Sequence, residues 1–314
     1  MEPVTASVPE PLRLIARPGD GGGAVARELP VVESVLRKLA VAFEVALAPG
    51  PGDAEREARR ALASGRRKLV AIGADRTVRE VVAGMMAAPE GSARPELAVL
   101  AGGSGCDFVR TFGLPEDTSA AAARLPDSVA YPIDVARISV RDPSGGERVT
   151  HFAGIAEAGL SGLVQRRADR AVERRPARAR RRAYFVAFWR TMARYAAPTM
   201  RVDVAARTFR GRAHNVVVGN CQFAREGIRV SPRSFPGDGL FEVLVYHGPK
   251  SDAFTLLPRM FRGEQVPHPN IEELRGRRIR VEADPPQWVQ ADGEALGLTP
   301  MVVELIPEAI TLRV

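Results

Sequence analysis

The stretch Lys68–Met85, KLVAIGADRTVREVVAGM, predicts a buried strand that turns sharply into a helix. Leu69–Ile72 is a short apolar run typical of parallel strands; Gly73 ends it, and valines then recur at helical spacing. The first N–H groups of such a helix have no partner within the helix, so they favour an anion such as phosphate. Asp75 lies in the turn, where its carboxylate either holds Mg²⁺ or simply caps the helix.

A second stretch, Leu97–Arg110, LAVLAGGSGCDFVR, repeats this arrangement. An apolar strand leads into Gly102, Gly103 and Ser104, and Asp107 follows shortly afterwards. Two such turns in consecutive strand–helix units favour a phosphate-binding edge over ordinary turns with aspartate caps.

Together the two stretches resemble a known family. Gly73–Val81, GADRTVREV, followed about 30 residues later by AGGSGCDFVR, resembles the paired GGDGT and GTxNDFAR motifs of the diacylglycerol kinase catalytic-domain family. That family includes bacterial lipid kinases and the sphingosine and ceramide kinases. Further segments resemble it in the same order, so that the resemblance covers nearly the whole chain: YPIDVARI, VVVGN with SPRSFPGDGLFEVLV, and QWVQADGEALG.

The first part of the chain alternates strand and helix candidates. A strand over Leu12–Ala16 leads into a glycine-rich turn, and a second strand over Phe43–Leu47 precedes the two units already described. Helices are expected over Val31–Ala42 and Asp53–Ser64. This alternation predicts a doubly wound parallel α/β domain of the nucleotide-binding type over residues 1–131.

From residue 132 the pattern changes to short strand candidates separated by Gly, Pro and Asp. Most have no helix between them, so residues 132–314 are expected to form an antiparallel β-sandwich or flattened barrel. Helical insertions interrupt it near Gly162–Arg194 and Ser251–Arg262, and the end of the chain is free to pack back on the first domain. The strand candidates are Ile133–Val140, Val149–Ala153, Met200–Val204, Asn215–Val218, Phe241–Tyr246 and Arg278–Val281.

Composition argues against several classes of protein. The two cysteines, Cys106 and Cys221, predict neither a disulfide framework nor a thiolate metal site, and the four histidines do not fall at metal-ligand spacing. No apolar run approaches the ~20 residues that cross a bilayer, and no signal peptide is recognised, so a reduced, cytoplasmic setting is expected. The oligomeric state stays open, a homodimer included.

Five aspartates in turn-like contexts match the family's acidic positions, although each alone also suits a cap or a turn. The resemblance implies that Asp292 is the general base for the lipid hydroxyl. It implies that Asp238 holds Mg²⁺ together with the carbonyls of Phe235 and Leu240. It also implies a water-linked acidic network that reaches the catalytic metal, formed by Asp75, Asp107 and Asp134.

The resemblance further places a nucleotide at the glycine turns. The positions expected to bind it are Arg17, Gly73, Asp75, Arg76, Thr77, Gly102, Gly103, Ser104 and Glu294. Several positions depart from the family pattern: Arg17 replaces Asn, Ala48 replaces Thr, Ala74 and Arg76 replace Gly, and Arg79 and Cys106 replace Asn. Arg76 is the most severe departure, because its side chain obstructs a phosphate near the backbone, and strain there can cost ~1–3 kcal/mol.

These arginines admit two interpretations. In the first, Arg17, Arg76 and Arg79 form a new anion pocket with direct phosphate contacts. In the second, they fold over a degenerate cleft and pair with nearby acids. The sequence leaves both open, and with them the use of ATP.

The net charge of +8 comes from one segment. Arg166–Arg194 carries 11 Arg against Asp169 and Glu173, so the rest of the chain sums to −1. The segment resembles the family's basic helical insertion, and aromatic residues beside it suit an anionic membrane surface, at ~1 kcal/mol per well-placed Arg. The alternative is a solvated basic helix whose aromatic residues belong to the core. The residues expected to face the membrane are Arg178, Arg180, Arg181, Arg182 and Trp189.

Three functions compete. The first is an ATP- and Mg²⁺-dependent lipid kinase, peripheral at the membrane, that phosphorylates a hydroxyl of diacylglycerol or a related amphiphile. The second is a non-catalytic or repurposed family member that binds a lipid or another anionic or natural-product-like ligand. The third is a kinase of the NAD type, which shares the GGDGT-like turn but lacks the unit at Gly102–Phe108. No helix-turn-helix, zinc finger or aromatic RNA-binding pattern accompanies the basic segment, which argues against nucleic acid.

Overall fold

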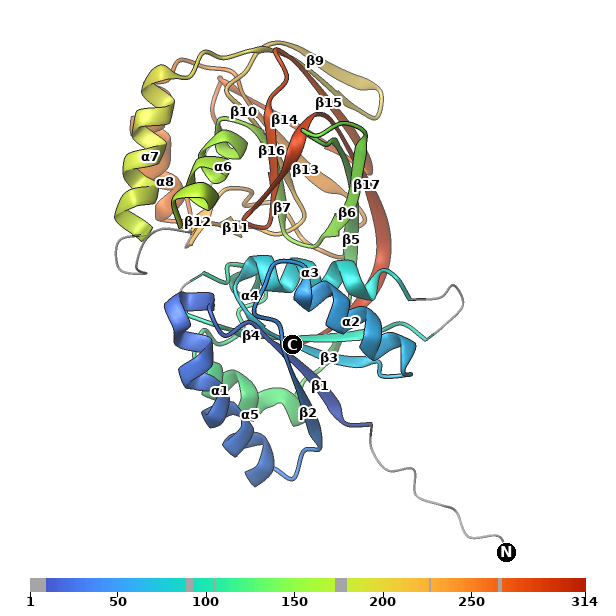
Figure 1. The fold of residues 1–314 in the computed structure, drawn as a ribbon. Coiled ribbons are helices and arrows are strands. Elements are labelled where there is room, and N and C mark those ends of the chain that lie inside the picture. The colour runs from blue at the N-terminus through green and yellow to red at the C-terminus, as the bar shows by residue number, and fades with distance from the viewer. Residues whose placement is uncertain (1–9, 89–92, 104, 173–179, 226, 265–266) are drawn as a thin grey trace, which may run out of the picture.

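The computed structural model describes residues 10–88, 93–103, 105–172, 180–225, 227–264 and 267–314, apart from the side chains of 170–172, 180–185 and 187. The chain forms two lobes, the first from its N-terminal part and the second from the remainder (Figure 1). The last strand runs from the second lobe back into the first.

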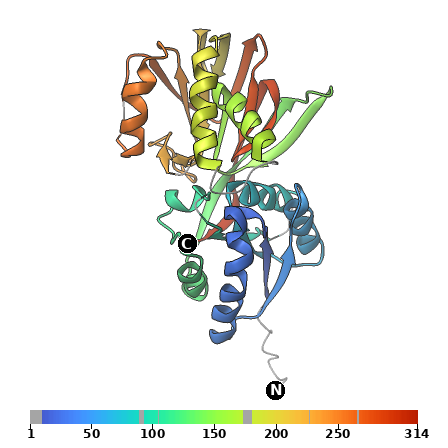
Figure 2. The ribbon, with the colours of Figure 1, turned by 60° about the vertical axis from the view of Figure 1, so that its left-hand side comes forward.

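The first lobe is a parallel sheet covered by helices on both faces. Its elements are β1 (Leu12–Ala16), α1 (Asp20–Lys38), β2 (Phe43–Leu47), α2 (Asp53–Ala63), β3 (Lys68–Gly73), α3 (Asp75–Met85), β4 (Glu96–Ala101), α4 (Phe108–Thr111), α5 (Thr118–Arg124) and η1 (Leu125–Asp127). The strand order is β2-β1-β3-β4, with α1 and α5 on one face and α2 and α3 on the other (Figure 2). Both faces of the central strands β3 and β4 are therefore buried, and the predicted α/β fold is confirmed.

The second lobe is antiparallel. Its elements are β5 (Ala130–Arg141), β6 (Glu147–Phe152), β7 (Ile155–Gly159), α6 (Leu160–Val172), α7 (Arg180–Arg194), β8 (Thr199–Val204), β9 (Arg207–Arg212), β10 (Asn215–Gly219), β11 (Phe223–Ala224), β12 (Ile228–Arg229), β13 (Phe241–Tyr246), α8 (Asp252–Phe261), β14 (Ile271–Gly276), β15 (Arg278–Asp284), β16 (Trp288–Ala291) and β17 (Glu294–Arg313). One layer runs β14-β13-β10-β7-β16-β17, and the other places β15, β8 and β9 on one side of β17 and β5 and β6 on its other side. Phe152 and Phe241 stack between the layers, which confirms the predicted sandwich.

Strand β17 joins the two lobes. Along most of its length it pairs with β5, but its end also pairs in parallel with β4, through Thr311 and Leu312. Ile310 and Leu312 belong to the same buried cluster as residues of α2 and α3. The division into lobes is therefore not a break in the hydrogen-bonded ladder, and this shared strand holds the two halves in a defined relation.

Helices α6, α7 and α8 gather on the outer side of the β7, β10 and β13 layer (Figure 1). They correspond to the two expected helical insertions. On α7, Trp189 stacks on Phe254 of α8 with 4.9 Å between ring centroids. Arg178 lies outside the described residues, and the side chains of Arg180, Arg181 and Arg182 are likewise not described, so the expected membrane-facing arginines stay a prediction.

Candidate functional site at the junction of the lobes

Three glycine-rich turns meet where β1, β3 and β4 end, because the carboxyl ends of parallel strands share one edge. The Gly102 N–H donates to the Gly73 carbonyl at 2.9 Å. Gly21 has φ +59°, and a Cβ there would lie only 2.6 Å from the Gly102 carbonyl oxygen. Close approach of these turns therefore requires glycine. Gly103 also belongs to this contact, whereas Ser104 lies outside the described residues.

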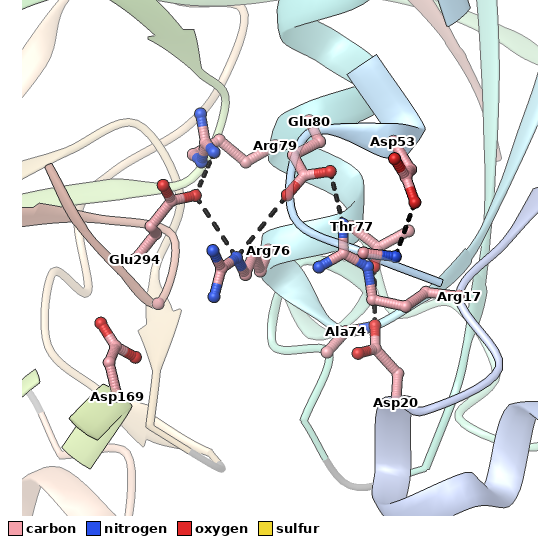
Figure 3. A network of polar contacts seen from close by, with 12 residues as sticks. Arg17, Asp20, Asp53, Ala74, Arg76, Thr77, Arg79, Glu80, Asp169 and Glu294 are labelled. Carbon is pink, nitrogen blue, oxygen red and sulfur yellow. Dashed lines mark hydrogen bonds and ion pairs between the residues drawn. The ribbon is translucent and has the colours of Figure 1, made fainter. Parts of the chain in front are cut away.

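The N-terminus of α3 is occupied by a carboxylate from the chain itself. Asp20, at the start of α1, accepts hydrogen bonds from the Ala74 N–H at 2.8 Å and the Thr77 hydroxyl at 2.6 Å (Figure 3). A Cβ at position 73 would lie 2.6 Å from the same Asp20 oxygen. In this structure the place expected for a phosphate is therefore taken by the Asp20 carboxylate, and nucleotide binding at this turn stays a prediction.

The arginines that depart from the family pattern are paired with glutamates (Figure 3). Arg17 forms an ion pair with Glu80 inside the first lobe, and Arg79 forms one with Glu294. The Arg76 Nε lies between them, 3.6 Å from Glu80 and 3.4 Å from Glu294. Arg17 is 7% and Glu80 1% exposed, so this pair is almost fully withdrawn from water. The arrangement is the one expected under the second interpretation, in which the arginines pair with nearby acids.

Glu294 connects the lobes electrostatically. It begins β17 in the second lobe, while Arg76 and Arg79 lie on α3 in the first, and Arg148 of β6 adds a contact at 3.0 Å. Burial raises the pKa of Glu294, but the charges of Arg79, Arg76 and Arg148 outweigh it, so that the pKa lies below its usual value. Glu294 is therefore ionised at neutral pH and bridges α3 to the second lobe.

Asp292 lies in the turn between β16 and β17, partly exposed and with φ +43°. Its carboxylate accepts hydrogen bonds from the N–H groups of Ala153, Gly154 and Ile155, at 3.2, 3.1 and 2.7 Å. Burial raises the pKa of Asp292, whereas these N–H donors lower it and hold the carboxylate in one orientation. A fixed carboxylate with a raised pKa is suited to accept a proton from a hydroxyl.

We expect Gly154→Ala to displace Asp292. An added Cβ would lie 2.4 Å from the Asp292 Oδ1, so the side chain has to rotate away from its N–H donors. Losing hydrogen bonds to a charged group should cost about 1–3 kcal/mol of folding free energy, measured by chemical denaturation. The control is Gly19→Ala, where a Cβ meets nothing within 4 Å and little change is expected. Equal stability of the two variants would contradict the position of Asp292.

Asp75 of the first lobe lies near Asp292 and also near Asp107. Asp75 accepts a hydrogen bond from the Phe108 N–H at 2.9 Å. Burial raises the pKa of Asp75 well above its usual value, and the charges of Asp107 and Asp292 raise it further. Asp107, 2% exposed, accepts from the Gly227 N–H of the second lobe at 2.7 Å. The structure therefore brings Asp75 close to Asp107 and to Asp292 at the lobe junction.

Asp134 and Asp238 make a different set of contacts. The two oxygens of Asp134 accept from the N–H groups of Gly239 at 2.9 Å and Glu308 at 2.8 Å. Asp238 forms an ion pair with Arg275 at 2.6 Å, and its other oxygen accepts from the Leu240 N–H at 3.0 Å. These contacts hold the turn around Asp238 against β5 and β14.

The turn around Asp238 does not fit a Mg²⁺ ion as its side chains lie. One carboxylate oxygen already faces the Arg275 cation, and the Phe235 carbonyl accepts from the Asp238 N–H at 3.2 Å. Within the described part of the chain, no group of three His, Cys, Asp or Glu side chains is arranged to hold a metal ion. The magnesium ligands expected here, Asp238, Phe235 and Leu240, therefore stay a prediction that these contacts do not favour.

A pocket of about 780 Å³, part of it open to solvent, lies between helices α6, α7 and α8 and the strands β7, β10 and β13. At its floor Glu157 is fully buried and accepts from Asn215 at 3.2 Å, from Gln290 at 2.6 Å and from Arg225. Gln290 precedes Asp292 by two residues, about 7 Å of strand. Apolar side chains dominate the walls: Leu160, Phe188, Met192, Leu256, Leu257 and Met260.

Comparison with known proteins agrees with this architecture. Residues 11–138 match the family model of the diacylglycerol kinase catalytic domain. Residues 154–314, half of the chain, match the model of the YegS C-terminal NAD kinase beta sandwich-like domain. The chain belongs to the diacylglycerol kinase catalytic-domain family.

Relatives in this family are similar along most of their length. A diacylglycerol kinase of Staphylococcus epidermidis is 24% identical over 292 residues, covering 92% of this chain and 87% of that protein. One of Staphylococcus aureus is 24% identical over 294 residues, with the same coverage. The crystal structure of a putative diacylglycerol kinase from Bacillus anthracis has a TM-score of 0.74 at 24% identity over 96% of both chains, a likeness of fold. These homologues support a lipid-kinase-like function, and membership of a kinase family implies the use of ATP.

Some residues of this site were not foreseen from the sequence. Asp20, Glu80, Arg148 and Glu157 carry no motif, and the pocket walls come from six elements far apart in the chain. One signal was available for Asp20, since it lies in the turn after the first strand, four residues beyond Ala16, and precedes three glycines. A carboxylate in that turn shares the edge of the sheet with the α3 turn.

Proposed function

We propose that the chain is a lipid-kinase-like phosphotransferase acting on the hydroxyl of an amphiphilic alcohol, diacylglycerol or a related lipid. The observation that carries this proposal is the position of Asp292. Asp292 directly follows β16, which pairs with β7, and Glu157 of β7 lines the apolar pocket. The charge of Asp292 also raises the pKa of Asp75 in the opposite lobe. An apolar tail in the pocket brings the hydroxyl to Asp292, while the donor lies on the side of the glycine turns.

Phosphoryl transfer requires the protein mainly to position the reactants and to stabilise the charge on the phosphates. Asp292 accepts the proton of the lipid hydroxyl while the hydroxyl oxygen bonds to the γ-phosphorus of ATP. The bond between the γ-phosphorus and the oxygen that it shares with the β-phosphate breaks, and ADP is released. Asp75 lies near this base, and Mg²⁺, the usual partner of ATP in such transfers, would supply charge neutralisation for the phosphates. The N–H groups of residues 153–155 keep the Asp292 carboxylate in place throughout.

Contact with an anionic membrane surface is part of the same proposal. Phe254 is 65% exposed although it stacks on Trp189, so the helices above the pocket present an aromatic pair to solvent. Arg190 and Arg194 are exposed on α7 beside it. Aromatic and basic side chains together suit the interface of an anionic bilayer. Among the described residues, no helix is long and apolar enough to cross a membrane.

The direct test is transfer of label from γ-labelled Mg·ATP to diacylglycerol in vesicles that contain anionic lipid. We expect labelled phosphatidic acid to form, faster with anionic than with neutral vesicles. Absence of label in diacylglycerol, monoacylglycerol and long-chain alcohols alike would refute the phosphotransferase proposal.

Filling the pocket should abolish lipid phosphorylation selectively. Ala253 lines the pocket on α8, so Ala253→Trp is expected to lower the rate with diacylglycerol at least tenfold and leave ATP affinity unchanged. Thr255→Trp on the same helix is the matched control, because Thr255 is exposed and does not line the pocket. Rates are compared in the vesicle assay and ATP affinity by calorimetry. Equal rates for Ala253→Trp and Thr255→Trp would mean that the lipid binds outside this pocket.

The ion pairs of Arg17, Arg76 and Arg79 favour a second candidate function, a repurposed member that binds an amphiphile without phosphorylating it. Such a protein would bind a short-chain diacylglycerol in calorimetry and show no heat with Mg·ATP. The kinase gives heat with both ligands.

A further inference from the structure

Three donors at the start of α3 are already used within the chain. The Ala74 N–H and the Thr77 hydroxyl donate to Asp20, and the Asp75 N–H donates to the Gly105 carbonyl at 3.1 Å. A helix N-terminus of this kind favours a phosphate because its N–H groups and its dipole point outward. Here the negative charge that completes the turn is the Asp20 carboxylate.

The backbone directly after Asp20 has an unusual conformation, which orients the Asp20 side chain toward α3. Asp20 is followed by Gly21, Gly22 and Gly23, all in the left-handed region with φ between +59° and +83°. Only glycine adopts this conformation in three successive residues at little cost. Gly21 is wedged against Gly102, so the turn cannot move freely without disturbing the β4 turn as well.

The cations near this turn are also neutralised internally. Arg17 and Arg79 are buried against Glu80 and Glu294, and Arg76 lies between the two glutamates. A polyphosphate that reached this turn would meet neither a free N–H at Ala74 nor an unpaired arginine among these three. The polyphosphate would also be repelled by the Asp20 carboxylate, which lies within hydrogen-bond distance of the Ala74 N–H and the Thr77 hydroxyl.

We propose that Asp20 is a specificity-determining residue that mimics a bound phosphate and so limits the binding of polyphosphate donors at the β3–α3 turn. The inference rests on the proposed function, which places the donor at the glycine turns. ATP binds there only when the Asp20 carboxylate leaves the Ala74 N–H. Removing this charge frees two donors and the positive end of the helix for a phosphate group.

The test is calorimetric titration of the full chain with Mg·ATP and with tripolyphosphate, a probe that carries no adenine. We expect Asp20→Ala to bind both at least about tenfold more tightly than the unmodified protein, because the freed donors form a charge-assisted hydrogen bond to the phosphate and the carboxylate no longer repels it. Asp20→Asn keeps the shape and the acceptor oxygen but not the charge, and should bind with intermediate affinity. It also serves as the second variant should Asp20→Ala unfold.

The matched control is Asp117→Ala. Asp117 caps α5 by accepting the Ala120 N–H at 2.7 Å, so it loses the same kind of hydrogen bond away from the glycine turns, and its ATP affinity should not change. Folded Asp20→Ala and Asp20→Asn proteins with unchanged or weaker affinity would overturn the proposal.

Binding and turnover separate this inference from the proposed function. Tighter ATP binding by the Asp20 variants without any lipid phosphorylation would support the role of Asp20 and refute the kinase. If the unmodified protein phosphorylates lipid but the Asp20 variants bind ATP no more tightly, the kinase proposal is supported and the role of Asp20 is refuted.

Discussion

Asp292→Asn is expected to lower the turnover of lipid phosphorylation by about 10²–10⁴-fold, the usual contribution of a positioned general base. Asparagine has the shape of aspartate and its amide oxygen still accepts from the Ile155 N–H, but it cannot take the hydroxyl proton. ATP affinity should stay within about twofold, because the base acts on the acceptor and not on the donor. Initial rates in the vesicle assay and calorimetry with Mg·ATP measure the two effects.

The control for Asp292→Asn is Asp203→Asn, the same chemical change on the exposed side of β8, where full turnover is expected. Turnover of Asp292→Asn within tenfold of the unmodified protein would remove Asp292 from the role of base. The proposal of a binding protein would then gain support.

The pH dependence of Asp292 has a defined sign. Because burial raises the pKa of Asp292, the protonated and inactive form persists to higher pH than for an ordinary carboxyl. Turnover should therefore fall as pH decreases through a value above the usual ~3.9, and this limb should be absent from Asp292→Asn. A raised pKa in the fold also means that the folded state binds a proton at Asp292 more tightly than the unfolded state does, so the stability from this group is present below the usual ~3.9 and is lost as the pH rises through its folded-state pKa.

The second large effect concerns stability. Arg17→Ala is expected to lower the free energy of unfolding by about 3–5 kcal/mol, because it leaves the buried Glu80 charge without its closest partner. Arg76 is 3.6 Å from Glu80 and compensates only in part. Chemical denaturation measures the loss, with Arg37→Ala as the control. Arg37 is an exposed arginine paired with Glu33 at i−4, where a change below about 1 kcal/mol is expected.

A double variant tests the origin of that loss. Arg17→Met with Glu80→Leu removes both charges, and replacing a buried ion pair by apolar residues is often neutral or stabilising. We therefore expect the double variant to recover most of the stability that Arg17→Ala loses. A loss below about 1 kcal/mol in Arg17→Ala would contradict a stabilising role of the Arg17–Glu80 pair.

Local pattern was enough to predict most of the framework. The strands expected at Leu12–Ala16, Phe43–Leu47 and Phe241–Tyr246 coincide with β1, β2 and β13, since each is a short, mostly apolar run set off by glycine, proline or polar residues. The start of α1 was placed too late, because three consecutive glycines do not suggest a helix. Strand β7 was missed, because its residues, Ile-Ala-Glu-Ala-Gly, are buried on both faces and carry neither alternation nor β-branched side chains after the first.

For the site, too, some features could be predicted from local sequence and others depend on the fold. Motifs that are contiguous in the chain were enough to predict the family, the two-lobe fold and the residue types at the acidic positions. The partner of each charge could be known only from the folded chain: Asp20 lies 54 residues from Ala74, and Arg79 lies 215 residues from Glu294. Whether an arginine binds a phosphate or a glutamate depends on which opposite charge the fold brings within a few ångströms of it, and Coulombic attraction at that range depends on distance and burial, not on position in the sequence.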